Sequence, residues 1–138
     1  MATLLGTEII KPNTLNPISL AYLGDAVYEI LVREHLALEG DKPPEQLHRL
    51  AVNFVSANSQ SAAAEKNMPI LTEEELTAYK RGRNAKVSHI PKGTSVAQYH
   101  SATGFESLFG HLYLTDQTDR MRELFRIICE GENFEQKN

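Results

Sequence analysis

The sequence predicts an all-α domain, and three observations support this fold class. Apolar residues recur at helical spacing through most of the chain, helix start and stop signals separate these segments, and no stretch alternates with the period of two typical of a half-buried strand. The 138 residues fit one domain, and the composition (41% hydrophobic, 23% charged) is ordinary for a globular protein. We expect an arm at 1–15, a helical bundle domain at 16–130 and a polar tail at 131–138.

The first helix is predicted to begin at Asn16-Pro17. Asn is a favoured N-cap residue, and Pro is favoured at the first helical position. Apolar side chains at helical spacing continue the helix to about Leu38, and Gly40 provides a stop signal.

Two further helices follow in the middle of the chain. Pro43-Pro44 opens the second, and the Ala-rich stretch at 62–64 extends it. Thr72 and Glu75 have the spacing of a capping box, which predicts a third, short helix.

The last third of the chain predicts a loop and two helices. Residues 82–94 contain two glycines and a proline and are typical of a loop with room for one helical turn. A fourth helix is expected from about Ser95 to Leu114, and a fifth after Thr118. The polar tail at 131–138 follows the apolar residues of the predicted fifth helix.

Several function classes lack support. The single Cys129 cannot form an internal disulfide, and no Cys/His group has zinc-ligand spacing. Glycine patterns of nucleotide-binding loops are absent, and no apolar run is long enough to span a bilayer. With no secretory signal pattern at the start, we expect a cytoplasmic protein without a membrane partner.

Two carboxylates interrupt otherwise apolar helix segments. Asp25 follows Gly24 in the first helix, and Glu106 lies between Gly104 and Gly110 in the fourth. Because Gly is unfavourable inside a helix, we expect another segment to approach the backbone closely at Gly24. Each acid could lie on a solvated flank or pair with a buried Arg. Alternatively, the two helices pack side by side and both carboxylates bind Mg²⁺.

The charge distribution favours a polyanionic partner despite a net charge of −4. Residues 76–105 contain no Asp or Glu, although five cations lie among them. Such a strip can attract nucleic acid, whereas a solvated loop is the usual alternative.

Three segments together resemble the ribonuclease III family over about residues 16–128. Leu-Ala-Tyr-Leu-Gly-Asp-Ala-Val at 20–27 is similar to the signature helix of its catalytic domains. Thr-Gly-Phe-Glu-Ser-Leu-Phe-Gly at 103–110 is similar to its second acidic motif. Tyr-Lys-Arg-Gly-Arg-Asn-Ala-Lys at 79–86 resembles a basic element of the Mini-ribonuclease III form, which has no separate domain that binds double-stranded RNA.

The resemblance implies an endoribonuclease that cuts double-stranded RNA and leaves 5′-phosphates. It implies that Asp25 and Glu106 are the catalytic residues and hold Mg²⁺, for which Mn²⁺ can substitute. Two further family acids are missing, because Ala21 and Thr103 stand in their places. The Mini-ribonuclease III form also implies a precursor of large-subunit (23S) ribosomal RNA as substrate, and action as a homodimer.

The acid-free basic strip supplies candidate RNA contacts, and the resemblance points to one residue for the partner subunit. Asn84 is a candidate for a ribose hydroxyl, and Gly82 would let the backbone approach the strand. The candidates for phosphate contacts are Lys80, Arg81, Arg83 and Lys86. Tyr22 stands where family dimers insert an aromatic side chain into the partner, although a core Tyr is the alternative.

Two other functions remain open from the sequence. The missing acids favour a catalytically silent RNA-binding dimer of the same fold, whereas the retained Asp25 and Glu106 favour an enzyme. A helical protein-interaction module would show no salt-dependent affinity for RNA.

Overall fold

The computed structural model describes residues 3–6, 11–87 and 89–130, and all regular structure among them is helical. This confirms the all-α prediction. No described helix is both long and apolar enough to cross a membrane. The helices in chain order are α1 (Pro17–Leu38), α2 (Pro44–Val55), α3 (Ala57–Asn67), α4 (Glu73–Arg83), α5 (Val96–Leu114) and α6 (Thr118–Glu130), with short 3-10 turns η1 (Pro12–Thr14) and η2 (Met68–Ile70).

Helix α1 begins and ends where the sequence predicts. The side chain of Asn16 accepts a hydrogen bond of 2.8 Å from the backbone N–H of Ile18, and Pro17 occupies the first helical position. The cap satisfies one of the backbone donors that every helix leaves free at its start.

The prediction of one long helix from Pro44 through 62–64 is wrong. Ser56 has extended backbone angles (φ −64°, ψ 157°) and separates α2 from α3. Its side chain accepts a hydrogen bond of 3.2 Å from the backbone N–H of Ser59 and so caps α3. Serine favours this capping position over a helix interior, and this preference outweighs the alanines that follow.

Helix α4 starts with the predicted capping box of Thr72 and Glu75, but it continues into the predicted loop and ends at Arg83. Gly82 is buried against α5, where an added Cβ would lie 2.5 Å from the Cβ of Ser107. The prediction that Gly82 lets the backbone approach RNA is therefore wrong. Its missing side chain serves the packing of α4 on α5.

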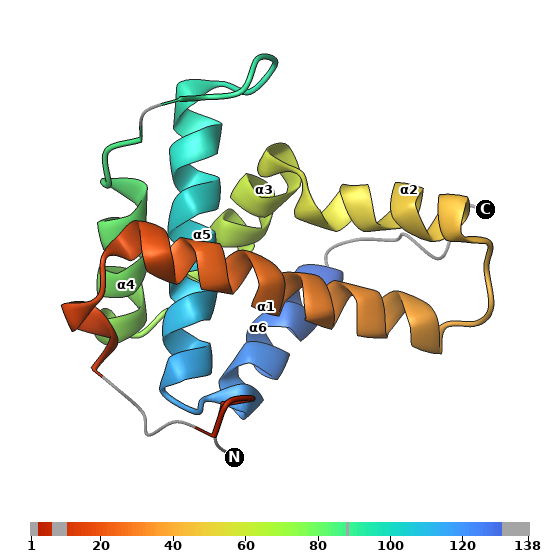
Figure 1. The fold of residues 1–138 in the computed structure, drawn as a ribbon, viewed down its shortest axis with the longest axis horizontal. Coiled ribbons are helices and arrows are strands. Elements are labelled where there is room, and N and C mark those ends of the chain that lie inside the picture. Colours follow the sequence, from red (N-terminus) through yellow and green to blue (C-terminus); the bar gives the residue numbers. More distant parts are fainter. Residues whose placement is uncertain (1–2, 7–10, 88, 131–138) are drawn as a thin grey trace.

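Helix α5 is the central element, because α1, α3, α4 and α6 pack against it, whereas α2 packs on α1 and α3. Figure 1 shows α1 crossing α5, with α4 alongside α5, and α1 makes its most extensive contacts with α5. Tyr28 of α1 packs against both Phe105 and Phe109 of α5, with ring centroids 4.8 and 5.3 Å away. All three rings are fully buried and form the centre of the core.

Two glycines let α1 and α5 pass unusually close to each other. A Cβ added at Gly24 would overlap the backbone carbonyl oxygen of Glu106, and one added at Gly110 would overlap that of Leu20. The predicted close approach at Gly24 is thus confirmed, and the approaching segment is the helix that carries Glu106.

Gly24→Ala should therefore destabilise the protein, although Gly to Ala in an open helix normally stabilises it by about 1 kcal/mol. We expect the free energy of unfolding in urea to fall by about 3 kcal/mol, because the helices must separate to admit the methyl group. The exposed Ala26 of α1 supplies a control, since Ala26→Gly should cost only about 1 kcal/mol of helix propensity. An unchanged or higher stability of Gly24→Ala would contradict the crossing.

Candidate active site

The crossing of α1 and α5 brings the two predicted carboxylates together. Asp25 follows the contact glycine on α1, and Glu106 supplies the carbonyl that Gly24 contacts. The two carboxyl groups lie within hydrogen-bonding range of each other. Their surroundings differ, since Asp25 is exposed whereas Glu106 is partly buried. Asp25 thus faces solvent rather than the apolar interior that its neighbours suggest.

In the metal-free protein, the surroundings of Glu106 hold the pKa of its carboxyl well above the ordinary value. Burial raises the pKa of Glu106 most, and the charge of Asp25 and the hydrogen bond with it raise it further, to about 8. Contact with the Gln60 amide acts in the opposite direction. Two carboxylates this close cannot both be ionised without a compensating cation.

The positions of the two missing family acids contribute no charge. Ala21 is buried, and the hydroxyl of Thr103 donates a hydrogen bond of 3.0 Å to the carbonyl of Tyr99. Among the described residues, no three or more His, Cys, Asp or Glu side chains cluster in a way that could hold a metal ion. The donor set on the described part of this chain is therefore the pair Asp25 and Glu106.

Gln60 is a site residue that the sequence reasoning missed. It lies on α3, its side chain is 1% exposed, and its amide interacts with Glu106. The signal was present, because Gln60 and Asn67 share one face of α3 with Ala63 and Ala64. A glutamine in line with buried alanines is a polar group placed in the interior.

The five predicted RNA contacts lie in the last turn of α4 and just beyond it, and four of them form one surface. Lys80, Asn84 and Lys86 are exposed, and Arg83 is half-buried. The guanidinium of Arg83 lies 5.7 Å from the ring centroid of Tyr79, and its Nε donates a hydrogen bond of 3.3 Å to Oδ1 of Asn84. This end of α4 is therefore a basic surface with one cation held in place.

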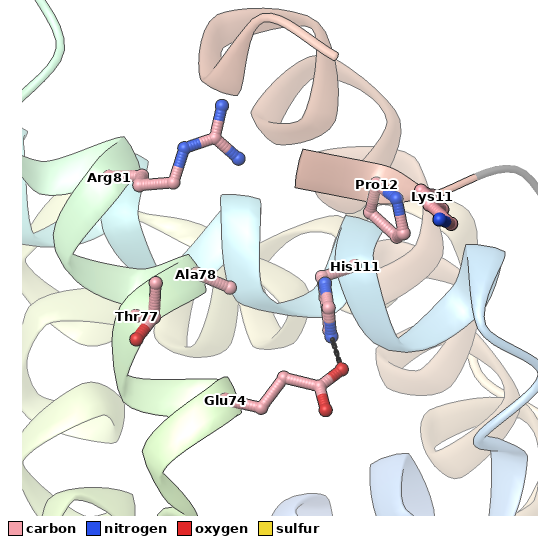
Figure 2. A pocket seen from close by; sticks show the side chains of 7 residues that line it. All are labelled: Lys11, Pro12, Glu74, Thr77, Ala78, Arg81 and His111. Carbon is pink, nitrogen blue, oxygen red and sulfur yellow. Dashed lines mark hydrogen bonds and ion pairs between the residues drawn. The ribbon is translucent and has the colours of Figure 1, made fainter. Parts of the chain in front are cut away.

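Arg81 points elsewhere, toward the segment before α1. Its Nη2 donates a hydrogen bond of 2.9 Å to the carbonyl of Leu15. Figure 2 shows Arg81 directed toward this segment, beside a pocket of about 350 Å³ that Lys11 and Pro12 also line. Arg81 thus differs from the other four candidates, because it joins α4 to the chain before α1.

The same pocket contains a contact between α4 and α5. Nε2 of the buried His111 lies 2.8 Å from Oε2 of Glu74, as Figure 2 shows. His111 follows Glu106 on α5, so this contact fixes α4 relative to the helix that carries the carboxylate.

Tyr22 lies on the surface of α1 and is 85% exposed, so the alternative of a core tyrosine is wrong. Ile18 and Ile30 of the same helix are also exposed, at 38% and 55%. An apolar strip therefore follows the outer side of α1, close to Asp25.

The chain is similar to known proteins over most of its length. The model of the Ribonuclease III domain family matches residues 18–117. A Mini-ribonuclease 3 of Symbiobacterium thermophilum is 46% identical over 89% of this chain and 95% of the relative. A Mini-ribonuclease 3 of Enterococcus faecalis is 48% identical over 80% of this chain and 85% of the relative. The crystal structure of a Fusobacterium nucleatum protein is also similar, with a TM-score of 0.77 and 29% identity over 86% of this chain and 94% of the other.

The Glu106 carboxyl should make the stability of the metal-free protein depend on pH. Its pKa is about 8 in the folded protein against an ordinary value of 4.5, so the folded state keeps a proton that the unfolded chain releases. The resulting stabilisation is complete below pH 4.5 and is lost as pH rises through about 8. Urea unfolding with a chelator should show wild type losing stability from pH 5 to 8 relative to Glu106→Gln. Parallel curves for the two proteins would contradict the assignment.

Proposed function

Because the chain belongs to the ribonuclease III family and is an endoribonuclease, we propose that it hydrolyses double-stranded RNA with Mg²⁺ held by Asp25 and Glu106. The meeting of these two carboxyl groups, carried by helices far apart in the chain, is the observation that supports the proposal most. We further propose a precursor of large-subunit ribosomal RNA as the substrate. That choice rests on the resemblance to the Mini-ribonuclease III form.

The carboxylate pair fits a divalent cation chemically. Mg²⁺ prefers oxygen ligands and readily keeps several waters, so two protein carboxylates suffice to hold it. Burial and, after it, the charge of Asp25 raise the pKa of Glu106, and a bound cation would favour the ionised carboxylate against both. Mn²⁺ has the same preference for oxygen and can substitute.

Asp25 and Glu106 would have different roles at the scissile phosphodiester. Asp25, on the exposed side, faces the solvent from which an RNA duplex approaches. Glu106 is partly buried, and its backbone lies at the contact with Gly24, so the fold limits the positions that its carboxylate can take. A bound Mg²⁺ would supply Lewis-acid chemistry, activating water and neutralising charge on the phosphate, so that cleavage leaves a 5′-phosphate and a 3′-hydroxyl.

Cleavage of duplex RNA should require Mg²⁺ and both carboxylates. Asp25→Asn should lower the rate by about 10³-fold, since several kcal/mol of charge stabilisation would be lost. Asp119→Asn makes the same chemical change at an exposed position on α6 and should leave the rate unchanged. A gel assay of duplex cleavage over a Mg²⁺ titration measures both. If wild type and Asp25→Asn are equally inert, the silent RNA-binding dimer is the better account.

The basic end of α4 is the proposed contact with the RNA backbone. Lys80, Arg83 and Lys86 would each neutralise a phosphate, and exposed Asn84 would contact a ribose hydroxyl. Arg81 was predicted to bind phosphate as well, but its bond to Leu15 gives it a separate role in holding the chain before α1.

Replacing each of Lys80, Arg83 and Lys86 by Ala should therefore weaken duplex binding and reduce the salt slope of the binding constant by about 1. Filter binding in Ca²⁺, without cleavage, gives the slope. Arg126→Ala on α6 is the matched control, because Arg126 is an exposed cation far from this segment in the chain. Equal slopes for all variants would reject the basic surface as the contact.

We also propose that the protein acts as a homodimer through the exposed strip of α1. Ile18, Tyr22 and Ile30 would become buried, and two-fold symmetry would place a second site for the opposite strand. Tyr22→Asp should convert a wild-type dimer into a monomer in analytical ultracentrifugation, because it places a charge in an apolar contact. A wild-type monomer, or a variant that still dimerises, would refute this interface.

A further inference from the structure

Helix α3 presents two buried amides to its neighbours. Gln60 and Asn67 lie on the same face, and their side chains are 1% and 0% exposed. Asn67 has a structural contact, since its Nδ2 donates a hydrogen bond of 3.2 Å to the carbonyl of Leu124 and so ties α3 to α6. The Nε2 of Gln60, in contrast to Nδ2 of Asn67, is a donor with no hydrogen-bond partner among the described residues, and Oδ1 of Asn67 is an acceptor without one.

A buried amide donor without an acceptor is unfavourable for folding. An apolar side chain of similar length would avoid the loss of hydration at no cost in packing. Unpaired polar groups of this kind are rare in folded proteins and are commonly explained by a catalytic role, a water or an ion. Gln60 therefore needs an explanation outside the packing of the metal-free fold.

The group that Gln60 faces is the Glu106 carboxyl. Contact with the amide favours the ionised form of that carboxyl, whereas burial and Asp25 favour the protonated form. The Glu106 carboxyl also interacts with Asp25, and Nε2 of Gln60 has no aligned acceptor among the described residues. An oxygen of this carboxylate, turned toward Nε2, would be the acceptor that the buried amide N–H lacks.

We propose that Gln60 is a positioning residue that donates its Nε2–H to the Glu106 carboxylate and holds that carboxylate in the orientation in which it shares a cation with Asp25. The inference rests on the proposed function, because it requires a cation at that pair. Gln60 itself does not touch the substrate or the cation. It supports one of the two protein ligands, as carboxylates that bind metals are commonly supported by a hydrogen bond.

The test compares Gln60→Met with wild type, Asn67→Met and Asp25→Asn. Met keeps the length of Gln and removes the amide, so the fold should be retained. Mn²⁺ alone is the probe, with free Mn²⁺ measured by electron paramagnetic resonance and the melting temperature measured with and without Mn²⁺. A second readout is the Mn²⁺ dependence of duplex cleavage, with KM for the duplex and kcat determined separately.

Gln60→Met should bind Mn²⁺ about tenfold more weakly, as expected on loss of one hydrogen bond to a charged group. Its metal-free melting temperature should be at least as high as that of wild type. Raising Mn²⁺ should restore its kcat, with KM for the duplex unchanged. Asn67→Met should melt at a lower temperature and bind Mn²⁺ like wild type.

If Gln60→Met binds Mn²⁺ as tightly as wild type while Asp25→Asn abolishes binding, this inference is overturned and the proposed function stands. An Asn67→Met variant that binds Mn²⁺ as weakly as Gln60→Met would also overturn the inference, because the loss of affinity would then come from disturbed packing of α3. A wild-type protein that binds no Mn²⁺ would overturn both this inference and the proposed function.

Discussion

The structure depends on how closely α1 passes α5. Side chains at Gly24 and Gly110 would collide with the backbone of the other helix, so the crossing exists only because both positions lack a Cβ. The aromatic core beside it, with Tyr28 packed against Phe105 and Phe109, stabilises the same contact. The crossing then decides the chemistry, since the residues next to the contact are Asp25 and Glu106. The two glycines thereby bring together two carboxylates that are far apart in the chain.

The carboxylate pair is unfavourable for the metal-free fold. Burial and the neighbouring Asp25 act against ionisation of Glu106, and the Gln60 amide remains unpaired beside it. Several groups that lower the stability of a fold and lie close together are typical of a functional site. In the proposed function, a cation resolves both, because it compensates the second negative charge and lets Glu106 accept a hydrogen bond from Gln60.

Much of the fold could be predicted because local signals agree with tertiary packing. The Asn16 cap, the capping box of Thr72 and the glycine beside Asp25 each have a direct physical reading, and the structure contains all three contacts. Ser56 was missed because the alanines after it favour a continuous helix, and only the capping bond reveals the break.

The site was harder to predict where a residue type serves two purposes. A glycine in a basic segment suits both RNA approach and helix packing, and only the contact of Gly82 with Ser107 decides between them. The same holds for Arg81, which bonds to Leu15, and for Tyr22, whose exposure no local pattern fixes. Gln60 was overlooked because a single amide carries no motif, although its position in line with buried alanines marks it as interior.

The account depends most on a single cation shared by the carboxylates of Asp25 and Glu106, and anomalous diffraction from crystals soaked in Mn²⁺ tests this directly. The account predicts an anomalous peak in contact with both carboxylates and no such peak in Asp25→Asn crystals. A wild-type map without a peak at this pair, or with a peak that contacts neither carboxylate, would contradict it.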